Sequence, residues 1–310
     1  MNALTAQPNP LYLGIDIGGT KVAAGLVDAS GEILFKTRVP MIANRDAAVG
    51  FSSVKQAADA VLRANSEVTP AGIGVTSPGP LDPLTGVVLN PPNLPCWRNF
   101  PLGDEVGRAF GISARVDNDA NAASLAEAIW GAGRGHRCVF YTTLGTGIGT
   151  GIVIDGHIWH GRTGAAAEGG HMTIDRNGPQ CGCGKHGCIE AFASGPAIAA
   201  RVAQRMKADT PITCETVAEA WRVGDPVAEV VLRETAGLLT VWLGNIIDLL
   251  EPDVIIVGGG VGELMSHWFD FIRASLPKWC VNQRCREIPL VLAKYKEDAG
   301  IAGAAALCLS

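Results

Sequence analysis

The 310-residue sequence has no excess of basic residues: 25 Lys and Arg stand against 30 Asp and Glu, which gives a net charge of −5. We therefore expect no nucleic-acid partner, because neutralising phosphates requires a surplus of Lys and Arg. The chain also lacks a Gly-X-Y period and a low-complexity linker, and 47% of its residues are apolar. Collagen-like and disordered classes are excluded on this ground, and the length suits two globular domains of ~150 residues each.

A signal peptide and a membrane span are also lacking. The first ten residues contain no basic segment followed by an apolar core. The longest apolar helical run, 237–250, is interrupted by Asn245 and Asp248 and is shorter than the ~20 residues of a span. We therefore expect a cytoplasmic protein with no membrane partner. Its nine cysteines are then expected to be thiols or metal ligands rather than a disulfide framework.

Glycine, by contrast, is abundant, with 39 of 310 residues against a usual share of ~7%. Its clusters fall in a pattern that occurs twice: strand, Gly-rich turn, strand, tight turn and strand. The predicted strands of the first copy are 11–17, 21–27 and 32–35, and those of the second are 139–144, 148–154 and 157–159. A repeat of this size predicts two similar α/β lobes with a cleft between them.

The remaining elements follow from apolar periodicity and from the residues that break it. We predict further strands at 72–75, 113–116 and 254–257, and helices at 47–64, 120–130 and 227–250. The predicted domains are a small N-terminal lobe of residues 1–117 with a C-terminal helix at about 299–310, and a larger lobe of residues 118–298.

Gly-rich loops are the candidate phosphate sites. One turn comprises Gly18, Gly19, Thr20 and Lys21, and the other comprises Gly145, Thr146 and Gly147. Such turns expose backbone N–H groups and leave room for a phosphate, although a plain hairpin would use glycine too. Neither is a Walker loop, and Thr150 stands where the dinucleotide-binding pattern requires glycine. A third loop, Gly258, Gly259 and Gly260, follows a buried strand and would let an adenosine approach the backbone.

Three cysteines and one histidine form a candidate zinc site. Cys181, Cys183 and Cys188 lie close together in a Gly-rich loop, after His171. Three thiolates and an imidazole complete a tetrahedral site that is closed to water and therefore structural. His186 is a competing ligand inside the same loop, and free core cysteines are the alternative to a metal. The intervening glycines and the absence of an apolar period favour the metal.

Carboxylates supply the candidate catalytic and sugar-binding groups. Asp119 lies where a predicted strand gives way to a helix, although a plain N-cap has the same pattern and Asp117, Asn118 and Asn121 crowd the same turn. The helix dipole should keep Asp119 ionised, which suits a group that orients an attacking hydroxyl in phosphoryl transfer.

Two glutamates flank the predicted zinc loop, and a bound metal would fix both in space. They are Glu168 and Glu190. Planar carboxylates suit bidentate hydrogen bonds to adjacent hydroxyls, which a sugar site requires. A pair of surface glutamates would have the same spacing.

Taken together, these motifs resemble the ROK family (repressors, open reading frames, kinases), and within it the bacterial ATP-dependent glucokinases. The resemblance covers residues 11–309. Its motifs are DIGGTK at 16–21, PPNLP at 91–95 with Trp97, NDAN at 118–121, LGTGIG at 144–149, EGGH at 168–171, CGCGKHGCIE at 181–190 and VGGGV at 257–261. The implied fold is the duplicated ribonuclease-H-like (actin-like ATPase) α/β sugar kinase fold with two lobes, with an inserted zinc-binding loop at 171–188.

The resemblance implies a kinase that moves the γ-phosphoryl of MgATP to the 6-hydroxyl of glucose, with Asp119 as the general base. The other implied sugar ligands are Gly79, Asn93, Asn118, Glu168, His171 and Glu190. The nucleotide and Mg²⁺ would lie near Asp16, Gly18, Gly19, Thr20, Lys21, Gly145, Thr146 and Gly147, with Gly258, Gly259 and Gly260 at the adenosine. A structural Zn²⁺ would be bound by His171, Cys181, Cys183 and Cys188. The family also suggests a homodimer.

The chain departs from the family pattern beside the implied sugar site. Ala167 and Gly169 flank Glu168 where glycine and an aliphatic residue are usual, and Thr150 and Cys96 replace usual glycines. Another hexose is therefore the main alternative: N-acetylglucosamine, N-acetylmannosamine, mannose, fructose or allose. A sugar-sensing repressor is the alternative from another class, but the ten residues before the first strand are expected to be too few for its DNA-binding domain.

Overall fold

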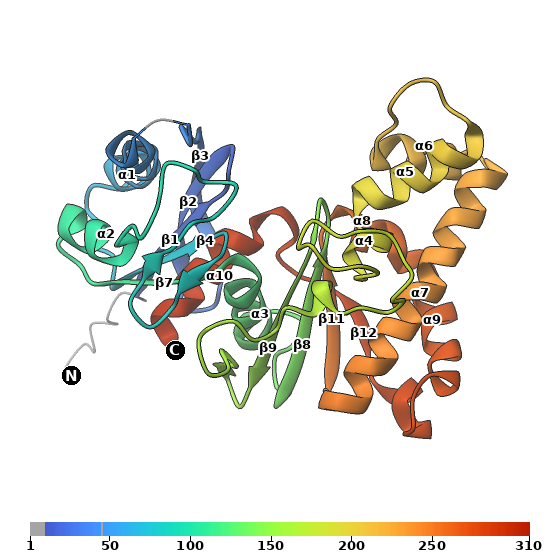
Figure 1. Ribbon diagram of the computed structural model, residues 1–310. Helices are drawn as coiled ribbons and strands as arrows, with labels where there is room; N and C mark the ends of the chain where they lie inside the picture. Colours follow the sequence, from blue (N-terminus) through green and yellow to red (C-terminus); the bar gives the residue numbers. More distant parts are fainter. Residues whose placement is uncertain (1–9, 45) are drawn as a thin grey trace. The chain divides into compact units, whose positions relative to one another are not determined.

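A computed structural model describes residues 10–44 and 46–310 (Figure 1). The predicted polar tail lies, apart from Pro10, outside the described residues. The chain forms two compact units. Unit 1 comprises Met1–Trp130, Gly156–Ala166 and Glu297–Ser310, and unit 2 comprises Gly131–Asp155 and Ala167–Lys296.

Unit 1 is built on a five-stranded sheet in the order β3-β2-β1-β4-β7. These strands are β1 (Leu11–Ile17), β2 (Lys21–Asp28), β3 (Ile33–Pro40), β4 (Gly72–Ser77) and β7 (Ala114–Asn118). The first three pair antiparallel, whereas β1, β4 and β7 run parallel. Because strand side chains alternate between faces, one face of β1 packs its buried Leu13, Ile15 and Ile17 in the core that also contains helix α1 (Ala47–Ala64).

The opposite face of this sheet packs closely on the C-terminal helix α10 (Ala299–Ala306). Gly14 and Gly74 allow this approach, since a Cβ at either position would overlap the backbone of α10. Figure 1 shows α10 in red beside the blue strands of unit 1, although the two segments stand at opposite ends of the sequence. The N-terminal end of α10 is thereby brought to Asp16, whose carboxylate lies against Gly300.

Unit 2 repeats the same topology, as the sequence predicted. Its strands follow the order β9-β8-β11-β12, with β8 and β9 antiparallel and β8, β11 and β12 parallel. They are β8 (Cys138–Leu144), β9 (Ile148–Ile154), β11 (Val254–Gly258) and β12 (Leu290–Leu292), whereas the short strand β10 (His157–Ile158) falls in the Gly156–Ala166 segment of unit 1.

Several elements complete the fold. The remaining strands and α-helices are β5 (Leu81–Asp82), β6 (Val87–Val88), α2 (Leu102–Phe110), α3 (Asp119–Trp130), α4 (Glu190–Ala193), α5 (Gly195–Met206), α6 (Cys214–Arg222), α7 (Pro226–Leu250), α8 (Gly260–Met265) and α9 (Phe269–Ser275). Short 3₁₀ helices lie at Gly169–His171, Ser266–Trp268, Leu276–Lys278, Gln283–Glu287, Lys296–Asp298 and Leu307–Leu309.

Helix α7 spans the predicted helix 227–250 and one residue before it. It has 25 residues, and its most apolar window has a mean hydropathy of 1.3, so that length and composition alone would allow it to cross a membrane. In the structure 61% of that window is buried. Trp242 and Leu239 lie among the buried residues of the unit 2 core, and α7 is therefore a core helix of this unit.

The division between the units differs from the boundary expected after residue 117. Helix α3 belongs to unit 1, because it packs along α10 so closely that a Cβ at Gly303 would overlap the backbone of Ala122. The segment Gly156–Ala166 also returns to unit 1, where Gly164 lies against Pro83. The two repeated sheets were visible in the sequence, whereas these packing partners were not.

Candidate functional site

In unit 1, the predicted site residues gather where the parallel strands end. The register pairs Asp16 of β1 with Thr76 of β4, and Thr76 with Asp117 of β7. The Thr76 hydroxyl donates to Asp16 Oδ1 at 2.8 Å. Because the carboxyl ends of parallel strands are the usual place for ligands in α/β sheets, this edge is the candidate site of the unit.

Asp119 is the first residue of α3, and Asn118 rather than Asp119 serves as the main cap of that helix. The Asn118 Oδ1 accepts from the backbone N of Ala120 at 2.9 Å and of Asn121 at 3.4 Å. Asp119 Oδ1 also accepts from Ala120 N, at 2.8 Å, but Asp119 is exposed to solvent. The carboxylate of Asp119 therefore retains accessible acceptor capacity for a substrate.

Two effects raise the pKa of Asp119 against the helix dipole, which is expected to favour its ionised form. Loss of hydration within the surrounding protein, followed by the negative charge of Asp16, raises the pKa of Asp119 to about 6. Burial also raises the pKa of Asp16, against the Thr76 hydrogen bond and the charge of Lys21. Loss of hydration and the charge of Asp16 together therefore outweigh the helix dipole, and Asp119, which is still largely ionised at neutral pH, has a pKa suited to a general base.

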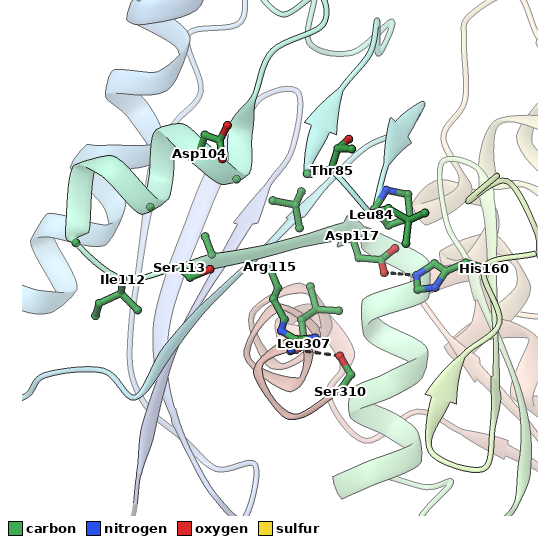
Figure 2. Close-up of a pocket in the computed structure, with 17 residues that line it drawn as sticks. Leu84, Thr85, Asp104, Ile112, Ser113, Arg115, Asp117, His160, Leu307 and Ser310 are labelled. Carbon is green, nitrogen blue, oxygen red and sulfur yellow. Dashed lines mark hydrogen bonds and ion pairs between the residues drawn. The ribbon is translucent and has the colours of Figure 1, made fainter. Parts of the chain in front are cut away.

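Asp117, which the sequence left among the candidate bases, is instead held in contacts with neighbouring side chains. Its side chain is 5% exposed, and its Oδ2 lies 2.5 Å from Nε2 of His160 (Figure 2). Asn121 Nδ2 donates to its other oxygen at 3.1 Å. The hydrogen bond to Asp117 raises the pKa of His160. Asp117 and His160 border a hollow of about 780 Å³ beside β7 and α2, and their own pairing leaves Asp117 unavailable as the base.

The remaining predicted residues of unit 1 lie near this edge. In the turn between β1 and β2, Gly18 N donates to Lys21 O at 2.9 Å. Gly19 packs against the loop that carries Asn93, since a Cβ there would lie 2.9 Å from Asn93 O. Gly79 is near Asn118, whose Nδ2 would be 3.8 Å from a Cβ at 79.

In unit 2, the second Gly-rich turn is held by three neighbours. Gly195 N, at the start of α5, donates to Gly145 O at 2.8 Å. Glu190 Oε2 accepts from Ile148 N at 2.8 Å, and a Cβ at Gly147 would lie 2.8 Å from the same oxygen. Gly259 has φ +81° and packs so closely on Leu144 that no Cβ fits. The predicted phosphate turn and the predicted adenosine loop therefore adjoin each other.

A cavity of about 1160 Å³ opens beside this turn, within unit 2. Gly145, Thr146 and Gly260 line it, as predicted for a nucleotide site. Sequence reasoning missed most of the lining, which includes Gly195, Pro196, Cys214, Ala218, Trp221, Arg222, His267 and Lys296. The Ser194-Gly-Pro start of α5, where Ser194 caps the helix, is a signal for that helix. No sequence signal placed α6 against it.

The residues predicted to bind zinc come together in unit 2. The ligand atoms of His171, Cys181, Cys183 and Cys188 all lie within 4.8 Å of one another. Cys183 Sγ is 3.7 Å from Cys188 Sγ, and Cys181 Sγ is 3.6 Å from His171 Nδ1. Tetrahedral zinc with Zn–S of ~2.3 Å and Zn–N of ~2.0 Å separates ligand atoms by about 3.5–3.8 Å, so these residues fit the ion.

The competing ligand, His186, lies outside this cluster. It is exposed, and its Nδ1 is 3.3 Å from the carbonyl oxygen of Gly178. His171 faces the cysteines with Nδ1, which leaves Nε2 for another partner. Glu190 Oε1 is 3.8 Å from Cys181 Sγ and 3.9 Å from His171 Nδ1, so Glu190 lies between the cluster and the Gly-rich turn.

Comparison with known proteins places this geometry in a family. The ROK family model matches residues 12–310. The glucokinase of Thermotoga maritima is 34% identical over alignments covering 97% of this chain and 98% of that protein. The glucokinase of Streptomyces coelicolor is 37% identical, with 96% and 97% covered. A crystal structure of a ROK family glucokinase from Streptomyces griseus in complex with glucose and AMPPNP is 36% identical, with a TM-score of 0.81 and 96% and 98% covered.

Relatives with other activities are also similar to the chain. The N-acetylmannosamine kinase of Salmonella typhi is 31% identical, with 95% of this chain and 97% of that protein covered. The xylose repressor of Caldicellulosiruptor bescii is 26% identical, and the alignment covers 96% of this chain and 78% of the repressor. The full-length family match and the duplicated sheet topology lead to one conclusion: the chain belongs to the ROK family and has its two-lobed, actin-like sugar kinase fold.

Proposed function

We propose that the protein is an ATP-dependent hexokinase that transfers the γ-phosphoryl of MgATP to the 6-hydroxyl of glucose, giving glucose 6-phosphate and ADP. The observation that carries the proposal is Asp119, an accessible carboxylate at the end of β7 whose pKa is raised to about 6. A base with this acidity is largely deprotonated at neutral pH and still accepts a proton well. The glucokinase relatives supply the substrate class.

In the proposed reaction, the carboxylate of Asp119 orients the sugar 6-hydroxyl and accepts its proton as the oxygen attacks the γ-phosphorus. The transition state of phosphoryl transfer is loose, so orientation and charge stabilisation matter more than strong basicity. Backbone N–H groups of the turns at 18–20 and 145–147 stabilise the phosphates. Asp16, held by Thr76 at 2.8 Å, lies near the Mg²⁺ of the substrate.

The sugar hydroxyls are assigned in this proposal to the ligands that the family resemblance implies. These are Asn93, Asn118, Glu168, His171 and Glu190. The free Nε2 of His171 would bind the sugar while Nδ1 binds zinc, so that a structural ion fixes a substrate ligand. The zinc itself supplies no step of the reaction.

The adenosine is proposed to occupy the cavity of unit 2. Its volume of about 1160 Å³ suits a nucleotide, and the turn Gly145–Gly147 at its border suits the phosphates. Trp221 and His267, both on the wall, offer aromatic surfaces for a base. A polar edge is provided by Glu215 and Lys296.

A kinase for another hexose is the second candidate. The observation that favours it is the unusual environment of Glu168, flanked by Ala167 and Gly169, together with the similarity to an N-acetylmannosamine kinase. A sugar-sensing regulator is a third candidate, supported by the repressor relatives.

ATP-dependent ADP release across a panel of hexoses and N-acetylhexosamines, with zinc retained, tests these candidates. Strong preference for glucose supports the proposal. Preference for another sugar keeps the mechanism and reassigns the substrate. Binding of ATP and sugar without transfer to any member of the panel supports the regulator instead.

A further inference from the structure

Thr150, in strand β9, holds the backbone on both sides of Glu168. Its side-chain hydroxyl donates a hydrogen bond to the carbonyl oxygen of Ala167 and accepts one from the backbone N of Gly169, the latter at 2.8 Å. The residue is only 5% exposed. A hydroxyl can donate one hydrogen bond and accept two. Thr150 donates one and accepts one, and both partners lie in the loop that carries Glu168.

The same loop is held from its other side by helix α7. Trp242 Nε1, on a fully buried side chain, donates to the carbonyl oxygen of Gly169 at 3.0 Å. Both backbone polar groups of Gly169 therefore have a side-chain partner, and the residue itself is buried. Ala167 has φ +61°, a left-handed conformation that an alanine adopts only when its surroundings hold it there.

Glu168 is the residue that this arrangement places. It is exposed, and among the residues that the structure describes no side chain or backbone N–H donates to its carboxylate. Its backbone oxygen accepts from His171 N at 3.0 Å. Because no hydrogen bond within the described part of the chain orients the Glu168 carboxylate, its direction depends on the backbone that Thr150 holds.

Thr150 and Gly169 are also matched in size. A Cβ at residue 169 would lie 2.8 Å from Thr150 Oγ1 and 3.2 Å from Thr150 Cγ2. Real Cβ atoms do not approach this closely, so a side chain at 169 excludes the present position of the Thr150 hydroxyl. Two departures from the family pattern, at 150 and 169, therefore form one contact.

We propose that Thr150 is a positioning residue for the sugar ligand Glu168, and that the matched pair Thr150–Gly169 sets the hexose selectivity of the site. This inference rests on the proposed function, because it treats Glu168 as a sugar ligand. Small displacements of a positioned group have large effects on reaction with a bound substrate. The pair therefore affects the sugar far more than the nucleotide.

The first test compares Thr150→Val, which keeps the shape and removes both hydrogen bonds, with Thr150→Ser, which keeps the hydroxyl. For Thr150→Val, the KM of the preferred sugar rises at least about tenfold, because loss of even one buried hydrogen bond gives a change of this size, while the KM of ATP stays within about twofold. Thr150→Ser stays close to the wild type. Equal changes in both KM values, or no change in a folded Val variant, would overturn the inference.

The second test is a double-mutant cycle at the contact. Gly169→Ala places a methyl group against Thr150 and should shift the ratio of kcat/KM values for glucose and N-acetylmannosamine. Adding Thr150→Gly to Gly169→Ala removes the collision and restores part of that shift, because the two sites are coupled. Strictly additive effects of the two substitutions contradict a matched pair.

Amide hydrogen exchange separates this inference from the proposed function, since it needs no sugar. In Thr150→Val, the Gly169 N–H loses its acceptor and should exchange at least about tenfold faster, with the peptides of helix α3 unchanged. Unchanged exchange at Gly169 overturns the inference whatever the enzyme phosphorylates. If the Gly169 N–H exchanges faster in Thr150→Val but the wild-type protein binds no sugar, the hydrogen bond from Gly169 to Thr150 is confirmed. The same result refutes the proposed function and overturns the role of Thr150 in selectivity.

Discussion

The Glu190 carboxylate joins two parts of unit 2 that have different chemistry. Its Oε2 accepts from Ile148 N at 2.8 Å, at the end of the Gly145–Gly147 turn, and its Oε1 lies 3.9 Å from His171 Nδ1 in the zinc cluster. We therefore expect movement of the cluster to be transmitted to the turn. This contact would link the predicted zinc site to the predicted phosphate turn within unit 2.

Replacement of Glu190 should weaken the binding of both ATP and sugar, and a second substitution should separate the two effects. In Glu190→Ala, the Ile148 N–H loses a charged acceptor, and we expect the KM values of ATP and sugar each to rise by about ten- to hundredfold. Glu190→Gln keeps an acceptor oxygen for Ile148 and should recover most of the ATP KM but not the sugar KM. Steady-state kinetics with both substrates varied measures this split, and Glu67→Ala, an exposed glutamate of unit 1, is the control.

Asp119→Asn tests the general base. The amide keeps the size of the side chain and an oxygen for Ala120 N, so folding and sugar binding should be retained. Loss of proton acceptance should lower kcat by about 10²- to 10⁴-fold, the usual contribution of a general base. Glucose affinity, measured by calorimetry without ATP, should stay within about threefold of the wild type. Near-normal turnover would remove Asp119 from this role, and Asp104→Asn on the exposed face of α2 is the matched control.

The repeated sheets could be predicted because each depends on local sequence. Burial alternates along β1 with Leu13, Ile15 and Ile17 on one face, and the turns after β1 and β8 are marked by glycine. The grouping of the four predicted zinc ligands could be anticipated for the same reason, since three of the four lie in one loop.

The parts that could not be predicted depend on contacts between distant residues. His160 pairs with Asp117 across 43 positions, and Trp242 reaches Gly169 across 73. No local pattern specifies such partners. The same holds for the wall that α6 gives to the cavity of unit 2, and for the packing of α3 on α10 that places the boundary between the units after Trp130.

The pH dependence of kcat/KM should report the acidity of Asp119. The base is active when deprotonated and its pKa is raised from 3.8 to about 6, so activity should be constant above that value and fall as pH decreases through it. The slope on the acid side should approach tenfold per pH unit. Rates measured from pH 5 to 8, with Mg²⁺ and ATP saturating throughout, give the apparent pKa. Activity that stays constant down to pH 5, as expected for a carboxyl group with an ordinary pKa, would contradict the perturbed environment.

The same perturbation predicts that the Asp119 carboxylate, the proposed base, lowers the stability of the folded protein. A folded-state pKa of about 6 exceeds the ordinary 3.8, so the charged carboxylate is disfavoured in the folded protein, and this cost is fully present above about pH 6. Asp119→Asn should therefore have a higher Tm than the wild type at pH 7.5, and the difference should vanish below about pH 4. Thermal melts at both pH values measure it. A lower Tm for the variant at pH 7.5 would show that the charged carboxylate stabilises the folded protein, and would contradict the raised pKa.

Removal of zinc should impair sugar binding more than nucleotide binding. Cys188 is fully buried and its Sγ lies 3.7 Å from Cys183 Sγ, so Cys188→Ser should lose the ion and release both His171 and Glu190. We expect zinc content to fall and glucose affinity to weaken at least about tenfold, since supporting contacts in metal sites have effects of this size. Metal analysis and calorimetry on the variant and on chelated wild type measure both. Cys138→Ser, outside the cluster, is the control, and a metal-free protein that binds glucose normally would show that the cluster does not support the sugar site.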